Sequence, residues 1–183
     1  MSLKIPIILG TARVGRRSEK VARYMLGVAK EYGLNTYLID VKDFIIGYTD
    51  DKLSTEAAKR YKELMRDIDG LIIVTPEYSH GFPGELKILM DTIYKEYYRR
   101  PLGIVAVSSG RGGARAVDSI RTIAIDLGFV PIKQALYFAP VDEILSDDSR
   151  LVREEFRSSI DRFMRELIWF AETLRYGRLN IKE

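Results

Sequence analysis

Short apolar runs alternate with longer amphipathic segments along the whole chain. The apolar runs predict five strands, at Ile5–Leu9, Thr36–Ile39, Leu71–Val74, Ile104–Val107 and Ile132–Phe138. Apolar residues at helical spacing predict helices over Ser18–Tyr32, Thr55–Ile68, Gly84–Tyr98, Ala114–Leu127 and Arg150–Tyr176. Aliphatic strands separated by helices are typical of a parallel sheet that helices cover on both faces. The pattern therefore predicts an α/β fold, a doubly wound three-layer sandwich with a five-stranded parallel sheet.

The organisation of the chain favours a single domain. Its 183 residues fit the usual domain size of ~100–200 residues, and no linker, repeat or low-complexity tract divides residues 1–183. Pro6 lacks the amide donor that strand pairing needs, so pairing on that side of the first strand should begin at or after it. No apolar run approaches the roughly 18 residues of a membrane span. The N-terminus shows no secretory signal pattern, which predicts a cytoplasmic protein without a membrane partner.

Composition excludes several kinds of chemistry. The chain has no cysteine and one histidine, His80, so thiol catalysis, Ser-His triads and Cys- or His-rich metal sites lack their residues, and we expect no metal. The net charge of +3 is too small to predict a nucleic-acid binder. Two asparagines and one glutamine stand beside 29 Lys and Arg residues, a scarcity of heat-labile side chains that favours a thermophilic source.

The candidate chemistry lies in the loops after the first, third and fourth strands, because open α/β sheets bind ligands at the carboxyl ends of their strands. The first loop, residues 10–18, carries glycines, the hydroxyls of Thr11 and Ser18, and arginines that include Arg13 and Arg16. It leads into a helix N-terminus, so it predicts a phosphate cradle. The alternative is a Ser18 helix cap beside solvated arginines.

The second loop, residues 75–84, combines two aromatic rings, a carboxylate, His80 and two prolines, which suits a flat ligand ring. The alternative is a packed crossover with Pro83 at a helix start. The third loop, residues 108–114, has three glycines in four positions, whose open amides suit an anion or a polar ring edge. Such turns also occur without ligands.

Two nucleotide-binding fingerprints are absent. The first loop has no Gly-Lys-Ser/Thr, which disfavours a nucleoside triphosphatase, and Gly10 and Gly15 do not form Gly-x-Gly-x-x-Gly. Asp40 ends the second strand where a ribose-binding acid of a dehydrogenase would stand. A plain turn residue is the more common interpretation of such an aspartate.

Together these loops resemble the NADPH-dependent FMN reductases, a family of the flavodoxin-like superfamily. The resemblance rests on three motifs across residues 4–140, which are Gly10-Thr11-Ala12-Arg13 with Ser18, Pro76-Glu77-Tyr78-Ser79 leading to Pro83-Gly84-Glu85-Leu86-Lys87 with Asp91, and Ser109-Gly110-Arg111-Gly112-Gly113. Thr11 replaces the usual serine and keeps its hydroxyl. Ser79 and Ile88 stand where the family often has asparagine, so side-chain amide contacts are not expected there.

The resemblance implies a flavodoxin-like fold and an FMN cofactor. It implies that Thr11, Arg13 and Ser18 bind the phosphate, and that the isoalloxazine ring lies between the second and third loops. The cofactor-binding residues expected in all are Thr11, Arg13, Arg16, Ser18, Pro76, Glu77, Tyr78, Ser79, Phe82, Ser109, Gly110, Arg111, Gly112 and Gly113.

The implied activity is hydride transfer from NADPH or NADH to the flavin N5, and onward electron transfer to a small acceptor such as a flavin, quinone, azo dye or metal ion. The flavin carries this chemistry, so we expect no catalytic side chain. Backbone amides of the third loop are expected to stabilise negative charge near the flavin N1. Arg16, Arg17 and Arg111 are candidates for the 2′-phosphate of NADPH, against the alternative of solvated surface charge.

The last predicted helix also indicates self-association. Trp169 and Tyr176 lie seven residues apart on its otherwise charged face, opposite the core stripe. Aromatic residues exposed in line on one helix suggest a subunit contact. The alternative is that both rings are simply exposed to solvent. The resemblance implies a homodimer or homotetramer. The alternative functions are a non-enzymatic flavodoxin-like electron carrier, a nicotinamide dehydrogenase without flavin, and a basic interaction module.

Overall fold

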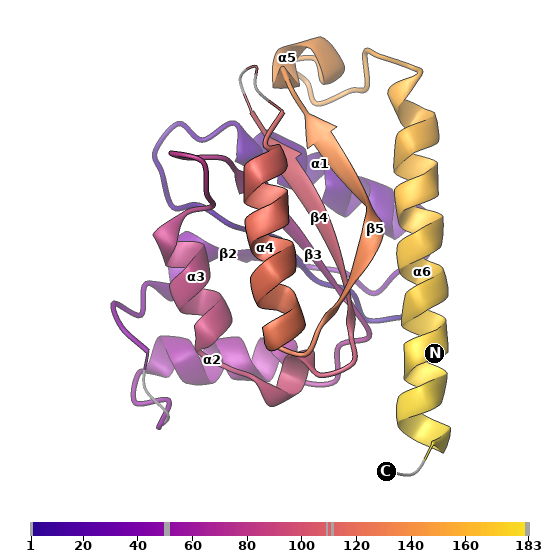
Figure 1. Cartoon of the computed structure of the whole chain (residues 1–183). Coiled ribbons are helices and arrows are strands. Elements are labelled where there is room, and N and C mark those ends of the chain that lie inside the picture. Colours follow the sequence, from indigo (N-terminus) through magenta and orange to yellow (C-terminus); the bar gives the residue numbers. More distant parts are fainter. Residues whose placement is uncertain (1, 50–51, 109, 111, 182–183) are drawn as a thin grey trace.

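A five-stranded parallel sheet forms the centre of the molecule (Figure 1). The computed structural model describes residues 2–49, 52–108, 110 and 112–181. The strands are β1 (Ile7–Leu9), β2 (Leu38–Asp40), β3 (Leu71–Pro76), β4 (Pro101–Val107) and β5 (Val130–Phe138). Their order, β2-β1-β3-β4-β5, is that of flavodoxin-like folds. The predicted fold class is thereby confirmed.

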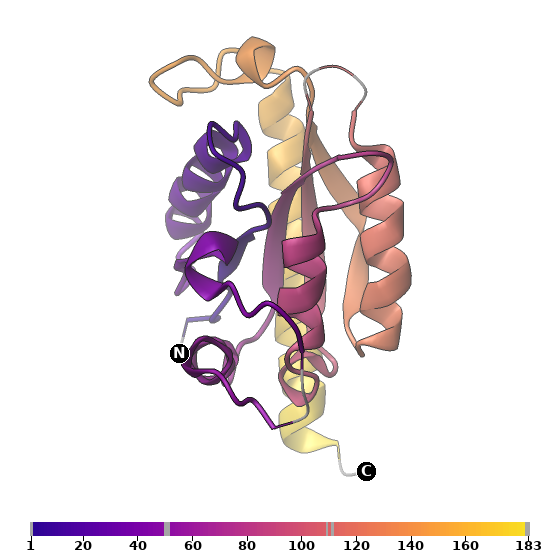
Figure 2. The ribbon, with the colours of Figure 1, turned by 90° about the vertical axis from the view of Figure 1, so that its left-hand side faces the viewer.

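Helices cover both faces of the sheet (Figure 2). Apolar residues of α1 (Ser18–Glu31) and α6 (Phe156–Asn180) join one core, and those of α2 (Glu56–Met65), α3 (Gly84–Asp91) and α4 (Ala114–Asp126) join the other. The shorter helical segments are α5 (Val141–Ile144) and the 3₁₀ turns η1 (Val41–Phe44) and η2 (Lys95–Tyr97). The three layers are the helix–sheet–helix sandwich that the alternating pattern predicts.

The burial of each strand follows from its place in the sheet. Every residue of β3 and β4 is buried, because each has a strand on both sides and helices on both faces. The edge strand β5 instead exposes Lys133 and Tyr137. Pairing of β1 with β3 begins at Ile7, directly after Pro6, as expected, and the Pro6 carbonyl still accepts a bond from the Ile72 amide (3.1 Å). On the side of β2, a bridge between Lys4 and Asn35 precedes Pro6.

The third helix is shorter than its predicted span, Gly84–Tyr98. It ends at Asp91, and the chain continues through η2. Tyr97 explains the difference, because its side chain is fully buried and stacks on Phe129 with 4.5 Å between ring centroids. Its hydroxyl also lies 2.7 Å from that of Tyr61. Tertiary packing of this ring turns the chain inward, whereas the sequence shows only helical spacing.

The last helix begins later and ends later than predicted. It starts at Phe156 rather than Arg150, because residues before it form α5 and a bridge between Leu145 and Leu151. Of the stripe expected to face the core, Ile160, Phe163, Leu167 and Ala171 are fully buried, whereas Phe156 and Leu174 at its ends are only partly buried. The aromatic residues expected on the opposite face are 59% exposed (Trp169) and 67% exposed (Tyr176).

Gly103 in the middle of β4 lets α6 pack close to the sheet. A Cβ at this position would lie 2.5 Å from Cζ of Phe163. We expect Gly103→Ala to lower the free energy of unfolding by about 1–3 kcal/mol, because the buried ring has to shift. Gly27→Ala is the control, since a Cβ in this exposed position of α1 meets no atom within 4 Å and alanine favours the helix. Urea unfolding of both variants checks this, and equal stabilities would contradict it.

Within the part of the chain that the structure describes, no helix is long and apolar enough to cross a membrane.

Candidate functional site

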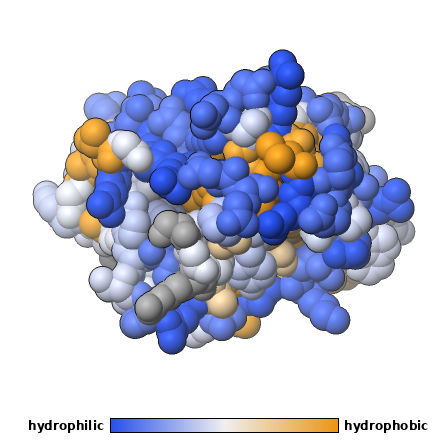
Figure 3. Space-filling view, turned by 90° about the horizontal axis from the view of Figure 1, so that it is seen from above, coloured by the Kyte–Doolittle hydropathy of each residue, from blue (hydrophilic) through white to orange (hydrophobic). Residues whose placement is uncertain are grey.

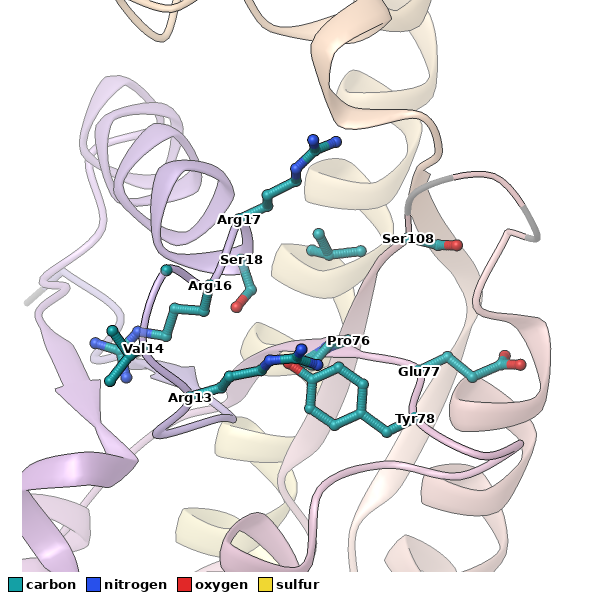
Figure 4. Close-up of a pocket in the computed structure, with 11 residues that line it drawn as sticks. Arg13, Val14, Arg16, Arg17, Ser18, Pro76, Glu77, Tyr78 and Ser108 are labelled. Carbon is teal, nitrogen blue, oxygen red and sulfur yellow. The ribbon is translucent and has the colours of Figure 1, made fainter.

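A cleft of about 410 Å³ opens at the carboxyl ends of β1, β3 and β4 (Figure 4). In the sheet, β2 lies on one side of β1 and β3 lies on the other, so the order of the strands reverses at β1. Open α/β sheets bind ligands at such a switch point, and the cleft lies there. Its lining comes from the three loops that the sequence singled out. The lining residues are Arg13, Val14, Gly15, Arg16, Arg17, Ser18, Pro76, Glu77, Tyr78, Val107 and Ser108.

Ser18 is the most informative polar group in this cleft. Its side chain is 1% exposed, and its hydroxyl has no hydrogen-bond partner among the described residues. Figure 4 shows the hydroxyl pointing toward the space above Arg13. Ser18 is also the first residue of the 14-residue helix α1, whose N-terminus receives no side-chain cap from a described residue. A buried unpartnered hydroxyl beside uncapped helix amides is suited to an anion.

Two arginines supply positive charge around Ser18. The guanidinium of Arg13 lies over the ring of Tyr78, 5.3 Å from its centroid, so the first and second loops contact each other across the cleft. Arg17 is 56% exposed and pairs with Asp142 of α5 at 2.8 Å. Arg13 and Arg17 therefore place positive charge at the rim of the cleft, and each is held by a contact with a neighbouring segment.

Arg16 stabilises the conformation of the first loop. Its side chain is only 4% exposed and forms a two-pronged ion pair with Asp40 at the end of β2. It also pairs with Glu19 at 3.3 Å and donates to the Thr11 carbonyl. Burial alone would lower the pKa of Arg16, but these carboxylates outweigh it and raise that pKa. Arg16 and Asp40 thus fix the loop to the sheet.

Thr11 and Glu85 form a second anchor for the same loop. The Thr11 side chain is fully buried, and its hydroxyl donates to Oε1 of Glu85 on α3 at 3.0 Å. The Ala12 amide donates to the same oxygen at 2.9 Å. Burial raises the pKa of Glu85, but these hydrogen bonds outweigh burial and hold it below its ordinary value. The Thr11 hydroxyl is therefore turned toward α3 and lies outside the cleft lining.

Glu77 connects the second loop to α4. Its carboxylate accepts from the amides of Arg115 (3.1 Å) and Ala116 (3.4 Å) in the first turn of that helix. This is a favourable position for a negative charge. Arg115 also contacts Nδ1 of His80 at 2.6 Å. His80, in a left-handed backbone conformation with φ of 68°, is thereby held at the outer edge of the loop.

The structure brings together six of the expected cofactor residues in the cleft lining: Arg13, Arg16, Ser18, Pro76, Glu77 and Tyr78. The remaining described ones lie outside it: Thr11, Ser79, Phe82, Gly110, Gly112 and Gly113. Ser79 is exposed, and Phe82 packs on the core beside α3. Ser109 and Arg111 lie outside the described residues.

The sequence interpretation missed the roles of Glu85 and Arg115. Glu85 stood inside the second motif, but its partner Thr11 is 74 residues away. The sequence around Arg115 gave no indication of its contacts with Glu77 and His80, apart from its position after the glycines of the third loop. Gly113 itself has φ of 79°, and a Cβ there would lie 2.7 Å from the Ala106 Cβ, so this glycine lets the third loop approach β4.

The end of the molecule that carries the cleft is mostly hydrophilic, with smaller apolar patches between polar residues (Figure 3). A charged ligand group thus meets polar surroundings here.

Comparison with known proteins agrees with this geometry. The sequence model of the NADPH-dependent FMN reductase family matches residues 3–142. The chain is 28% identical over 172 residues to 2-hydroxy-1,4-benzoquinone reductase of Burkholderia sp, an alignment that covers 90% of this chain and 93% of that protein. It is 23% identical over 185 residues to the FMN-dependent NADPH-azoreductase of Staphylococcus haemolyticus, covering 95% and 98%.

Among solved structures, the flavoenzyme NAD(P)H:acceptor oxidoreductase FerB of Paracoccus denitrificans has the same fold. Its TM-score is 0.81 at 18% identity, and the match covers 93% of this chain and 98% of that one. The family match extends over most of the chain and includes all three loops of the cleft. The chain therefore belongs to the NADPH-dependent FMN reductase family.

Proposed function

We propose that this chain holds FMN in the cleft, accepts reducing equivalents from NADPH or NADH, and delivers them to a small quinone or azo acceptor. Family membership supports the cofactor and the reductant. The names of the two relatives, a benzoquinone reductase and an azoreductase, support the acceptor classes. Reductase relatives also favour an enzyme over a non-enzymatic electron carrier.

The observation that carries this proposal is the hydroxyl of Ser18, which has no partner among the residues that the structure describes. It lies buried at the uncapped N-terminus of α1, with Arg13 beside it. A phosphate group would supply an acceptor oxygen for this hydroxyl and a negative charge at the N-terminus of α1. Ser18, Arg13 and the first turn of α1 would therefore hold the FMN phosphate, while the Pro76–Tyr78 segment would contact the rest of the cofactor.

Bound FMN supplies the redox chemistry, and the residues of the chain supply binding and orientation. Arg16 with Asp40, and Glu85 with Thr11, fix the conformation of the first loop. Glu77 fixes the second loop on α4. No side chain is assigned a proton-transfer role, because the proposed hydride transfer requires none.

Comparison of FMN with riboflavin tests the phosphate assignment. We expect riboflavin to bind at least about a hundredfold more weakly, because it lacks the dianionic group that Ser18 and Arg13 would contact. Flavin fluorescence quenching measures both dissociation constants. Equal affinities would contradict the assignment and with it the orientation of FMN in the cleft.

Arg17 is our proposed contact for the 2′-phosphate of NADPH. Its guanidinium is exposed at the rim, whereas that of Arg16 is buried against Asp40. We expect Arg17→Gln to raise the KM for NADPH about tenfold, because a charge-assisted bond is lost, and to leave the KM for NADH unchanged. Steady-state kinetics with both nucleotides decides this. An equal effect on both would exclude Arg17 as the selective contact.

We further propose a homodimer or homotetramer formed through α6. Trp169, Tyr176 and Leu179 are 59%, 67% and 74% exposed on this helix. Exposed aromatics of this kind are enriched at subunit contacts. Light scattering coupled to gel filtration should give a mass of two or four chains, and a monomer mass would contradict it. A cytoplasmic location remains a prediction from the N-terminal sequence, and a thermophilic source a prediction from composition.

A further inference from the structure

A second hollow, of about 570 Å³, lies at the amino ends of the strands, at the end of the sheet opposite the cleft. Asp69 stands two residues before β3 and Arg100 directly before β4, and α6 contributes Arg175 and Arg178 from its last turns. Lys4, before β1, completes the charged lining. The six residues of β3 span about 20 Å, so this hollow is well separated from the proposed FMN position.

Positive charge exceeds negative charge in the described lining of this hollow. Lys4, Arg100, Arg175 and Arg178 stand against two carboxylates, Asp67 and Asp69.

Asp69 is shared among several donors. It accepts from the Lys4 amide at 2.9 Å, from Arg178 at 3.1 Å and from Arg175 at 3.5 Å. One carboxylate thus serves two guanidinium groups and a backbone amide. An anion from solution would balance the excess positive charge of the described lining.

Besides burial, the positive charges around Arg178 lie close enough to lower its pKa. Burial, together with the nearby charges of Arg100 and Arg175, lowers that pKa to about 10, although Asp69 opposes the shift. Burial also lowers the pKa of Arg100. An anion bound between these groups would relieve the repulsion.

Backbone carbonyls already hold the guanidinium groups in place. Arg100 donates through Nε to the Ile68 carbonyl at 3.1 Å and through Nη1 to the Tyr98 carbonyl. Arg178 donates through Nη1 to the Arg99 carbonyl at 2.8 Å. Because these side chains are fixed before a ligand arrives, binding costs little side-chain entropy.

From this arrangement we propose that the hollow lined by Lys4, Arg100, Arg175 and Arg178 is a second anion site, which binds a multiply charged phosphate group. Guanidinium groups bind phosphate oxygens with paired hydrogen bonds, and the concave lining limits access to a small ligand. The phosphate belongs either to a free inorganic ion or to a nucleoside phosphate. The site is independent of the flavin cleft, because no lining residue is shared between the two.

Calorimetric titration with inorganic pyrophosphate tests this site in protein saturated with FMN, which fills the cleft. We expect one pyrophosphate per chain at constant ionic strength. Arg175→Gln should weaken this binding about tenfold, because one charge-assisted contact is lost. Arg23→Gln is the matched control, since it removes the same charge from an exposed position on α1 and should change the affinity less than about twofold.

Lys4→Gln provides a second variant should Arg175→Gln fail to fold, and it should weaken binding similarly. Titration with ADP separates the two sources of phosphate. Tighter Arg175-dependent binding of ADP than of pyrophosphate supports a nucleoside phosphate, and equal binding supports a free phosphate. Absence of pyrophosphate binding, or equal weakening by Arg175→Gln and Arg23→Gln, would overturn the proposal.

Discussion

Replacing Ser18 with aspartate is expected to weaken FMN binding at least about a hundredfold. The Ser18 hydroxyl is buried in the cleft and has no partner within the described part of the chain, so a carboxylate there would face the proposed FMN phosphate, which carries about two negative charges. At a separation of about 4 Å near a protein surface, two unit charges repel by about 4 kcal/mol, enough for this loss. The fold should remain, because an aspartate is favourable at a helix N-terminus. Flavin fluorescence titration and thermal unfolding of the apoprotein measure the two effects.

Two further variants isolate the cause of this loss. Ser158→Asp makes the same change in the exposed first turn of α6 and should leave FMN affinity unaltered. Ser18→Ala removes one hydrogen bond without adding charge and should weaken binding about tenfold. If Ser18→Asp bound FMN as tightly as the parent protein, the phosphate would not lie at the N-terminus of α1.

Loss of the Glu85 carboxylate on α3 should destabilise the folded protein, because this carboxylate anchors the first loop. Glu85→Ala leaves the buried Thr11 hydroxyl and the Ala12 amide without their acceptor. We expect a decrease of about 2–3 kcal/mol in the free energy of unfolding. FMN affinity should fall as well, because the loop that carries Arg13 loses its support. Glu63→Ala, on the exposed surface of α2, is the control and should change stability by less than about 0.5 kcal/mol.

The pH dependence of stability tests the charge of Glu85. Its folded pKa lies below the ordinary value of 4.5, so its stabilising contribution is complete above that value and is lost as the pH falls through the folded pKa. Glu85→Gln keeps an acceptor oxygen but carries no charge. The stability difference between the parent and Glu85→Gln should therefore be larger near pH 7 than near pH 3 in urea unfolding. A constant difference would show that the charge does not contribute.

Local patterns in the sequence were sufficient to predict the sheet and the position of the cleft. The aliphatic runs at β3 and β4 are buried throughout, as predicted for central parallel strands. Because such strands end at one edge of the sheet, their loops had to converge there. Ser18 follows from the same reasoning, since it stands where the first loop enters α1.

The partners of the loop side chains could not be predicted in this way. A hydroxyl such as that of Thr11 has the same local signature whether it contacts a ligand or Glu85 on α3. Arg16 likewise is one of several arginines in the sequence, and only the position of Asp40 at the end of β2 makes it an internal anchor. These contacts depend on how distant elements pack, as does the inward turn of Tyr97 that ends α3 early.

The visible spectrum of the purified protein, mixed anaerobically with FMN and then with NADPH, tests the central claim most directly. We predict that FMN binds and that its visible absorbance band disappears rapidly once NADPH is added. Bound FMN that keeps its absorbance would contradict the reductase function and favour an electron carrier. A failure to bind FMN at all would contradict the proposed role of the Ser18 cleft.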